Sequence, residues 1–377
     1  MSISMNGQLS TRRAIVYGVL VCTMVFAVLA LAAEGAVRYR ERHRAHVPGS
    51  FPFIVYQHRT LLYALVHNTD YFGWIHVDSA GFRRGLPHTP NSGAIRILAD
   101  GASTTFDFGV SRDDRTWPAR LEYWLHQLAP TTPVEVLNAG VPGYLVWQNT
   151  ARLQNELYAH DPDVIILLTG HNDLGRALAG APDPLAYRER PDEVRSIPAV
   201  RRWLSEHSLL FAKMQDRLGW IAHRSHERDI GQTAERAEDV LRGRVSQGQS
   251  AFERDIRFYL AAAKTVGIPV VLPGVVHVNR PTDSVATGAE ATSWHNTSSA
   301  PTSVVLDGYR RYNAVLERVA PEYGDHYVDT APFLISGTRY YVEGDPMHFN
   351  DEGADLMARK LAEQLIASGV LARRGRQ

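Results

Sequence analysis

From Ile95 onward, short apolar runs rich in β-branched residues alternate with longer segments in which apolar residues recur at helical spacing. Each run is short enough to be a strand buried on both faces, as the strands of parallel sheets are. Such alternation is typical of a parallel sheet covered by helices on both faces. We therefore predict an α/β fold with three α/β/α layers and a five-stranded sheet. The predicted strands are Ile95–Ala99, Val134–Leu137, Val164–Leu168, Ile268–Leu272 and His326–Val328.

Helices are predicted between and after these strands. The first has leucine and tryptophan at helical spacing between residues 121 and 128, behind Thr116 as an N-cap and Pro118 in the first turn. Gly267 and Gly369 are suited to end two of the others. The remaining predicted helices are Trp147–His160, Phe252–Val266, Leu306–Val319 and Asp351–Ser368.

Three segments depart from this alternation. Residues 47–90 form an aromatic-rich lead-in to the sheet. Residues 175–249 carry mixed charge and many arginines and contain no strand candidate, so we expect a helical insertion. Residues 279–303 are rich in Thr, Ser, Pro and Ala, which predicts a long loop. We therefore expect residues 47–377 to be one domain that carries these additions.

The N-terminal segment has the composition of a membrane span. Residues 14–33 carry no charge, and two arginines precede them. A helix of that length is about 30 Å long, enough to cross the hydrocarbon core of a bilayer. The alternative is a cleaved signal peptide, because the small residues at 30–32 offer a cleavage pattern. The long run favours an anchor, with residues 1–46 forming a tail, the span and a charged tether.

The charges around the span leave its orientation open. Four arginines between residues 38 and 44 outnumber the two before the span, which by the positive-inside rule would face the domain to the cytoplasm. A short basic tail before the apolar run instead resembles a signal anchor, and large domains translocate despite their charge. We expect a single-pass protein of a bacterial inner membrane with its domain in the periplasm; secretion after signal cleavage is the other alternative.

Composition narrows the classes of function. Basic and acidic residues number 40 each, so no net field attracts the chain to nucleic acid, and we expect no nucleic-acid partner. Cys22 is the only cysteine and lies in the apolar run, which excludes a disulfide or a thiolate metal site in the domain. The 16 histidines include no metalloprotease-like His-Glu-x-x-His motif, which disfavours a metal-dependent deacetylase. Protein partners stay open.

A serine motif follows the first predicted strand, which runs into Gly101-Ala102-Ser103 ahead of a predicted helix. The carboxyl edge of a parallel sheet is where such folds bind ligands, and small residues let a substrate approach the backbone. Ser103 is therefore a candidate nucleophile. The alternative is that its hydroxyl only caps a helix.

Two further motifs follow the second and third predicted strands. The segment Asn138–Tyr144 places two glycines around a proline, which predicts a tight turn with free backbone amides. The segment Gly170–Asp173 contains Asn172, whose side-chain amide can donate to an oxyanion. Each motif alone is also what an ordinary loop contains.

The fourth motif, Asp345-Pro346-Met347-His348, lies immediately before the last predicted helix. If the segment turns, the Asp345 carboxylate meets the imidazole of His348 and fixes its tautomer. An isolated Asp-x-x-His is usually structural. All four motifs fall at the ligand-binding edge of the predicted sheet, so together they are much more specific than any one alone.

In this order and context the four motifs resemble the blocks of the SGNH, or GDSL-like, hydrolases over about residues 76–370. The resemblance implies a flavodoxin-like sheet and a serine esterase that needs no cofactor. It implies that Ser103 is the nucleophile, that His348 is the base and that Asp345 is the partner of His348. The expected substrate is an acylated small molecule or carbohydrate, above all one with O-acetyl groups on an envelope or exported glycan.

The same resemblance implies an oxyanion hole formed by the Ser103 amide, Gly143 and Asn172. Ala102 stands where the family has an aspartate, and this departure favours one alternative, an inactive binding or assembly module on the same fold. A second alternative is an O-acyltransferase, which would pass the serine ester to a sugar hydroxyl with the same triad. The candidates for stacking on sugar rings near the site are Trp147, Tyr340 and Tyr341.

Overall fold

The structure is a computed structural model, and it describes the segments that carry the predicted sheet and all four motifs. The predicted loop at 279–303 lies outside the described residues except at its end. The described residues are 11–42, 55–58, 60–71, 75–86, 93–180, 200, 203–204, 207–211, 213–214, 238–275, 300–330, 338–343, 345 and 347–371.

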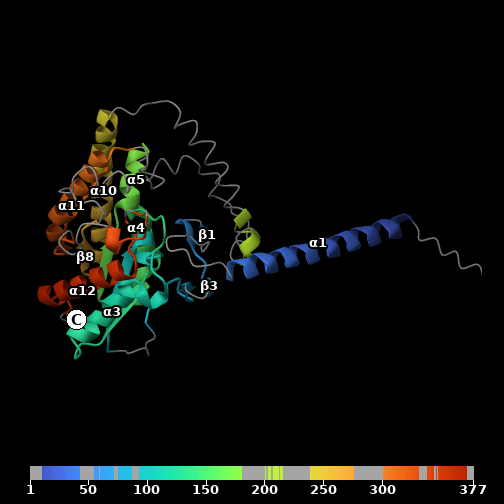
Figure 1. Cartoon of the computed structure of the whole chain (residues 1–377), viewed down its shortest axis with the longest axis horizontal. Helices are drawn as coiled ribbons and strands as arrows, with labels where there is room; N and C mark the ends of the chain where they lie inside the picture. The colour runs from blue at the N-terminus through green and yellow to red at the C-terminus, as the bar shows by residue number, and fades with distance from the viewer. Residues whose placement is uncertain are drawn as a thin grey trace, which may run out of the picture.

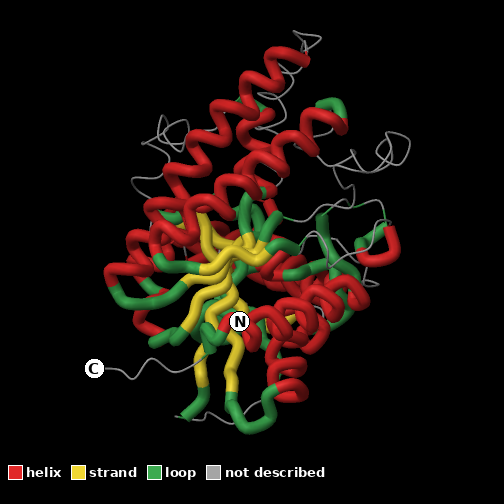
Figure 2. Tube along the Cα trace, turned by 90° about the vertical axis from the view of Figure 1, so that its left-hand side faces the viewer, coloured by secondary structure: helices red, strands yellow, loops and turns green. Residues whose placement is uncertain are grey.

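Five parallel strands form the central sheet, in the order β6-β5-β7-β8-β9. Counted along the chain this order is 2-1-3-4-5, which confirms the predicted flavodoxin-like fold. In Figure 2 the twisted yellow strands lie between red helices. The strands are β5 (Ile95–Gly101), β6 (Val134–Asn138), β7 (Val164–Leu168), β8 (Val270–Pro273) and β9 (His326–Val328).

The start of β8 differs from the prediction, which placed it at Ile268. Pro269 has no N–H to donate to the ladder, so regular pairing begins only at Val270. The carbonyl of Pro269 nevertheless accepts a hydrogen bond from the Ile165 amide at 3.0 Å, which ties the lead into β8 to the neighbouring strand.

Helices cover both faces of the sheet because its strands bury alternate residues on opposite sides. On one face Ile95, Ile97 and Ala99 of β5 pack with α3 and α12, and on the other Leu98 packs with α4, α5, α10 and α11. Figure 1 shows α10 and α11 side by side, as their contacts require. The helices around the sheet are α2 (Ser103–Phe106), α3 (Trp117–Leu128), α4 (Val146–Asn155), α5 (His171–Leu178), α10 (Glu238–Thr265), α11 (Thr302–Tyr323) and α12 (Asp351–Ser368), with short 3₁₀ turns at η1 (Asp113–Arg115), η2 (Leu157–His160) and η4 (Thr338–Tyr340).

The helix ends carry the capping residues that the sequence indicates. The side chain of Thr116 accepts a hydrogen bond from the Ala119 amide at the start of α3. The side-chain oxygen of Asn350 accepts a hydrogen bond from the Gly353 amide at the start of α12, at 3.0 Å. Gly369 ends α12 in the left-handed conformation, with φ of 70°. These local signals fix α12 to the predicted bounds.

The two ends of the predicted insertion belong to helices of the fold. Gly175–Leu178 completes α5, and α10 begins at Glu238 rather than at Phe252. Leu241 and Val245 of this extra length are buried in the same core as Phe252. Most of residues 181–237 lies outside the described residues, so an insertion there remains a prediction.

The lead-in folds into two antiparallel hairpins, β1 (Val55–His58) with β2 (Leu62–Leu65) and β3 (Thr69–Tyr71) with β4 (Ile75–Val77). Buried side chains from the lead-in pack against Phe106 and Phe108, next to the predicted nucleophile. This third cluster is Leu61, Leu65, Ile75, Val77, Ala102, Phe106, Phe108, Val141 and Tyr144. The lead-in is thus part of the packing around Ser103.

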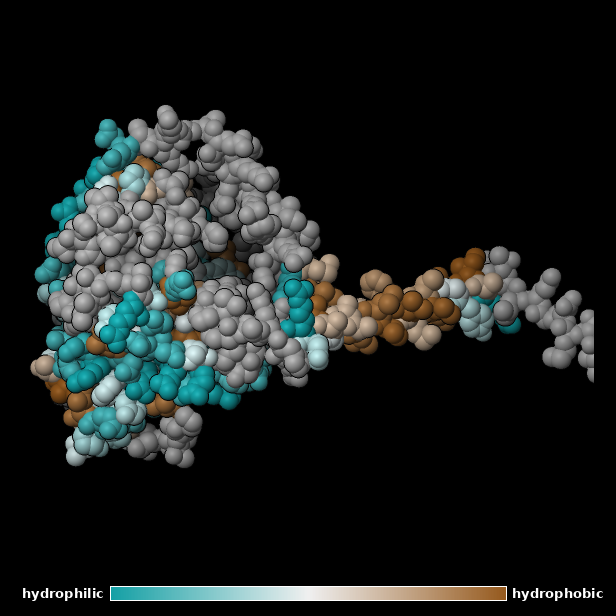
Figure 3. Space-filling view, viewed as in Figure 1, coloured by the Kyte–Doolittle hydropathy of each residue, from teal (hydrophilic) through white to brown (hydrophobic). Residues whose placement is uncertain are grey.

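The N-terminal apolar run forms one helix, α1 (Thr11–Arg42), with residues 13–40 long and apolar enough to cross a membrane. Figure 3 shows it as an apolar rod beside the more hydrophilic body. The first part of the predicted charged tether continues this helix, and within it Arg38 forms an ion pair with Glu34, one turn earlier, at 2.6 Å. Glu34 also accepts hydrogen bonds from the Leu209 and Leu210 amides, at 2.9 Å each.

Candidate active site

The serine motif occupies a sharp turn between β5 and α2. Gly101 ends β5 with φ of 148°, and a Cβ added there would overlap the carbonyl oxygen of Leu168 on β7. Only glycine therefore lets the chain leave the sheet at this point. Ser103 then opens α2 at the carboxyl edge of the sheet, where its own amide belongs to the first helical turn and has no intrahelical acceptor.

Ser103, His348 and Asp345 lie in one chain of hydrogen bonds. Nε2 of His348 is 2.8 Å from the Oγ of Ser103, and its Nδ1 is 2.6 Å from Oδ2 of Asp345. The other carboxylate oxygen, Oδ1, accepts from the amides of Met347 and His348 itself, at 2.9 and 3.0 Å. The Asp-x-x-His segment does turn, and its backbone amides hold the carboxylate beneath the imidazole.

The surroundings keep this carboxylate ionised. Burial raises the pKa of Asp345, but the hydrogen bond and charge interaction with His348 and the two amides outweigh it and hold the pKa below its ordinary value. His348 is fully enclosed, with the ring of Phe108 4.4 Å from its own. An ionised partner on Nδ1 leaves Nε2 facing Ser103, the arrangement that lets a histidine accept a proton from a serine.

The second and third motifs meet beside the serine. The Nδ2 group of Asn172, on α5, donates to the carbonyl of Tyr144 at 3.0 Å and so joins the two loops. The Val141 amide donates to the carbonyl of Gly101 at 3.1 Å, which places the loop against the serine turn. Gly143 has φ of 83°, a conformation that favours glycine. The structure thus places Gly143, after β6, and Asn172, in the first turn of α5, at the same carboxyl edge of the sheet as Ser103.

Residues that the sequence analysis did not select hold the serine turn from behind. Arg83, buried in the lead-in, donates to the carbonyls of Phe106 and Asp107 at 2.9 Å each and pairs with Asp113 at 2.8 Å. The indole of Trp117 donates to the carbonyl of Thr104 at 2.9 Å. Nothing local in the sequence indicates these contacts, because they join distant segments.

One of the three aromatic residues proposed to stack on sugars is buried. Tyr341 is buried in the core with its ring beside that of Phe349, so its ring is not available to a substrate. Tyr340 lies in η4 beneath the guanidinium of Arg339. Trp147 is partly buried and its indole nitrogen is enclosed. A sugar-stacking role therefore finds no support at Tyr341.

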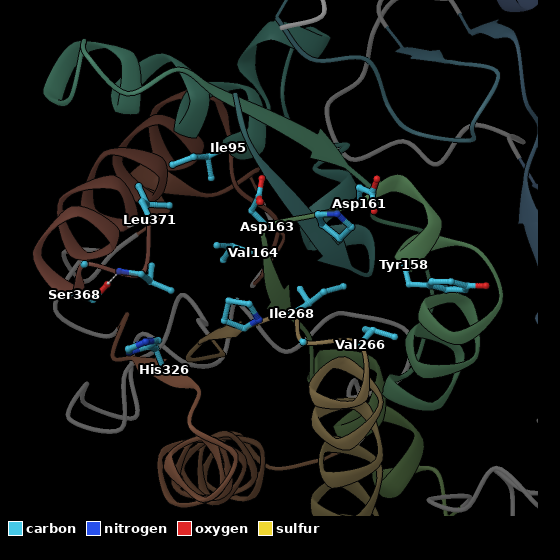
Figure 4. A pocket seen from close by; sticks show the side chains of 15 residues that line it. Ile95, Tyr158, Asp161, Asp163, Val164, Val266, Ile268, His326, Ser368 and Leu371 are labelled. Atoms are coloured by element: carbon cyan, nitrogen blue, oxygen red, sulfur yellow. Dashed lines mark hydrogen bonds between the residues drawn. The ribbon is translucent and has the colours of Figure 1, made fainter. Parts of the chain in front are cut away.

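A cavity of about 710 Å³ lies elsewhere, at the amino ends of the strands. Ile95, Val164 and His326 line it from the first positions of their strands, and Asp163 and Ile268 from the segments that lead into β7 and β8 (Figure 4). Because Ser103 lies at the opposite, carboxyl edge, this cavity takes no part in the site. Within the described ranges, no group of three or more His, Cys, Asp or Glu side chains is arranged to hold a metal ion.

Solved structures similar to this chain include two forms of one esterase. The acetylxylan esterase Axe2 of Geobacillus stearothermophilus has 16% identity, a TM-score of 0.41, and coverage of 72% of this chain and 95% of that one. A single-substitution variant of Axe2, an acetyl-xylooligosaccharide esterase, gives 15% identity, a TM-score of 0.41, and coverage of 76% and 98%. No curated protein matches the chain.

The family comparison covers the serine turn and the Asp-x-x-His segment together. The model of the GDSL-like lipase/acylhydrolase family matches residues 101–356, more than half of the chain. It begins at the glycine before the nucleophile candidate and ends in α12, so it includes the four motifs. The chain belongs to the GDSL-like lipase/acylhydrolase family and is an ester-hydrolysing enzyme.

Proposed function

We propose that the chain is a membrane-anchored serine esterase in which Ser103 is the nucleophile, His348 the general base and Asp345 the residue that orients the base. The observation that carries the proposal is the unbroken hydrogen-bond chain from Ser103 Oγ through His348 to Asp345. An inactive binding module would have no need of this arrangement. The alanine at position 102 leaves the chain intact, because Ala102 contributes no side chain to it.

The proposed reaction has two steps. The Oγ of Ser103 attacks the ester carbonyl while its proton passes to Nε2 of His348, and His348 then returns the proton to the departing alcohol. Water repeats the sequence on the acyl-enzyme, releases the carboxylic acid and restores Ser103. Asp345 remains ionised throughout and stabilises the positive charge on His348.

We assign the oxyanion hole to the amides of Ser103 and Gly143 and the side chain of Asn172. Asn172 donates one of its two amide hydrogens to the Tyr144 carbonyl, which leaves the second to donate to a substrate. The amide of Ser103 lies in the first turn of α2, where helix amides have no partner within the helix. Together these donors supply hydrogen bonds to the charge that develops on the ester oxygen.

Short acyl groups suit the enclosure of the site. Ser103 is only 5% exposed, and the residue before it, Ala102, belongs to the apolar cluster that contains Phe106 and Phe108. An enclosed serine accommodates an acetyl group more readily than a long acyl chain. Combined with an anchor at residues 14–33, this supports O-acetyl groups of an envelope or exported carbohydrate as the substrate. We propose a periplasmic domain because such a substrate lies on that side of the membrane.

The test compares the detergent-solubilised full chain with Ser103→Ala and with Ser250→Ala, a control at an exposed serine of α10. Hydrolysis of p-nitrophenyl acetate should vanish in the first variant and persist in the second. Two further measurements test the substrate class. We expect release of acetate from an O-acetylated oligosaccharide and no release of p-nitrophenol from p-nitrophenyl palmitate. Equal turnover by wild type and Ser103→Ala would remove Ser103 from the mechanism.

The same triad would also serve an acyltransferase, and the low exposure of Ser103 is the observation that favours this second candidate. An enclosed acyl-enzyme is shielded from water, so an acceptor hydroxyl could compete. Adding an unacetylated oligosaccharide to the assay separates the two reactions. Acetate that appears on the acceptor rather than in solution would establish transfer.

A further inference from the structure

The first hairpin of the lead-in lies directly on the loop that carries Gly143. The hydroxyl of Tyr63, on β2, donates to the carbonyl of Pro142 at 3.0 Å. In return the hydroxyl of Tyr144 donates to the Tyr63 carbonyl at 2.7 Å. The two tyrosine rings meet edge to face, with centroids 5.3 Å apart. Gln148 adds a bond to the Leu61 carbonyl, at 2.8 Å, so the hairpin is fastened to this loop at several points.

The hydrogen bond from Tyr63 acts on one particular peptide group. The Pro142 carbonyl and the Gly143 amide belong to the same peptide, which is planar and trans. Its C=O and N–H therefore point in opposite directions, and a donor that holds the carbonyl also fixes where the N–H points. A carbonyl that accepts a hydrogen bond further polarises its peptide, which makes the N–H a stronger donor.

The tyrosine hydroxyl is also close to Gly143 itself. A Cβ added to Gly143 would lie 2.5 Å from the Tyr63 hydroxyl oxygen, so the two residues are in close contact. On the far side of the loop, Asn172 holds the Tyr144 carbonyl at 3.0 Å. The Gly143 peptide is thus held between a hydrogen bond from the lead-in and one from α5.

We infer that Tyr63 is a positioning residue, which orients the Gly143 amide towards the developing oxyanion through its hydrogen bond to Pro142. The inference rests on the proposed role of Gly143 as an oxyanion donor. It extends the active site to a segment that precedes the family match, which starts at residue 101. The lead-in then contributes to transition-state stabilisation as well as to packing.

The test is Tyr63→Phe in the full chain, which removes the hydroxyl and keeps the ring against Tyr144. Losing a whole oxyanion donor costs about 10²–10³ in kcat. Misorienting one should cost less, and we expect kcat for p-nitrophenyl acetate to fall about 10-fold while KM stays within about twofold. Affinity for a small alkylboronic acid, which forms a tetrahedral adduct on the serine, should fall by a similar factor. Tyr158→Phe, at an exposed tyrosine of η2, is the matched control.

A double-mutant cycle separates positioning from general destabilisation. If Tyr63 acts through the loop that Asn172 also holds, Tyr63→Phe should change kcat much less in an Asn172→Ala background, where that loop has already lost its tie to α5, than in wild type. Thermal midpoints and near-ultraviolet circular dichroism of the single variant check that it is folded. An unchanged kcat, a rise in KM alone, or fully additive losses in the cycle would each overturn the inference.

Failure of the proposed function has a different signature. If wild-type turnover does not depend on Ser103, the oxyanion assignment fails and the inference fails with it. If Ser103→Ala abolishes turnover but Tyr63→Phe leaves kcat and boronate affinity unchanged, only the inference is overturned.

Discussion

Asp173 is a carboxylate that the fold encloses without a compensating cation among the described residues. It follows Asn172 on α5, and its Oδ1 accepts the Val146 amide at 3.2 Å where α4 begins. Its Oδ2 is buried and has no hydrogen-bond partner in the part of the chain that the structure describes. Burial, helped by the nearby charge of Asp255, raises the pKa of Asp173 to about 7, against the lowering effect of the Val146 amide. The replacement Asp173→Asn keeps the shape and removes the charge.

The direction of the effect follows from proton binding. The folded state holds the proton of Asp173 more tightly than the unfolded state, whose pKa is near the ordinary value of 3.8. Stability is therefore highest below about pH 4 and falls as the pH rises towards 7, after which the loss is constant. The pKa of Asp173 differs by about three units between the folded and unfolded states. At about 1.4 kcal/mol for each unit, the folded state loses about 4 kcal/mol of stability by pH 8. The neutral amide of the Asp173→Asn variant does not titrate, so that variant avoids this loss.

The assay is urea unfolding of the full chain in mild detergent, followed by tryptophan fluorescence from pH 4 to pH 9. We expect Asp173→Asn to match wild type near pH 4 and to exceed its free energy of unfolding by up to about 4 kcal/mol at pH 8. Asp114→Asn, at an exposed carboxylate, should run parallel to wild type. Parallel curves for Asp173→Asn, or a loss of stability at pH 8, would show that the Asp173 charge has a partner and refute the reasoning.

Three further substitutions test the site. Asp345→Asn should lower kcat by about 10⁴-fold, because the imidazole of His348 loses its ionised partner. Steady-state kinetics measure kcat, and circular dichroism checks that the variant is folded. A decrease in kcat of less than about 10-fold would contradict the prediction. Asn172→Ala should lower kcat by about 10²–10³-fold, and an unchanged rate would remove Asn172 from the oxyanion hole. Gly101→Ala should destabilise the fold by several kcal/mol, since its Cβ overlaps the Leu168 carbonyl; a thermal midpoint equal to that of wild type would exclude this strain.

The sheet and the four motifs were predictable because their signals are local. A buried strand followed by Gly101 and Ser103 already specifies a strand, a turn and a serine at the carboxyl edge of the sheet. Asp345 and His348 lie three positions apart, so a single turn brings them together. The same locality explains why α12 matches its prediction, since Asn350 and Gly369 are capping residues at each end.

Where the prediction failed, a competing signal had been given too much weight. The mixed charge and many arginines of residues 175–249 as a whole indicated an insertion up to residue 249, yet Leu241 and Val245 continue the apolar spacing of Phe252 and Ile256. That spacing buries one stripe of α10 and leaves Arg242 exposed on the other side of the helix. Helical periodicity was therefore the better guide than charge content.

Contacts between distant segments were beyond local signals altogether. Arg83 reaches Phe106 across 23 positions and Tyr63 reaches Pro142 across 79. Nothing in the spacing of either residue distinguishes it from an ordinary residue of a lead-in. Their roles follow only from the fold, which brings β2 and the segment after β4 beneath the serine turn and the Gly143 loop.

From these contacts we expect the lead-in to be a necessary part of the catalytic unit, although the family match begins at residue 101. Removing residues before 93 would leave the carbonyls of Phe106 and Asp107 and the carboxylate of Asp113 without Arg83, at a cost of about 1–3 kcal/mol for each buried group. It would also expose the apolar cluster around Phe108.

We therefore expect a fragment of residues 93–377 to be insoluble, or soluble without a reactive serine, whereas a fragment from residue 47 keeps both hairpins. A fluorophosphonate probe measures the difference, because it labels only a serine activated by its histidine. Equal labelling of the two fragments would show that the strand, turn and helix around Ser103 stand without Arg83 and Tyr63. The support that the structure assigns to the lead-in would then be dispensable.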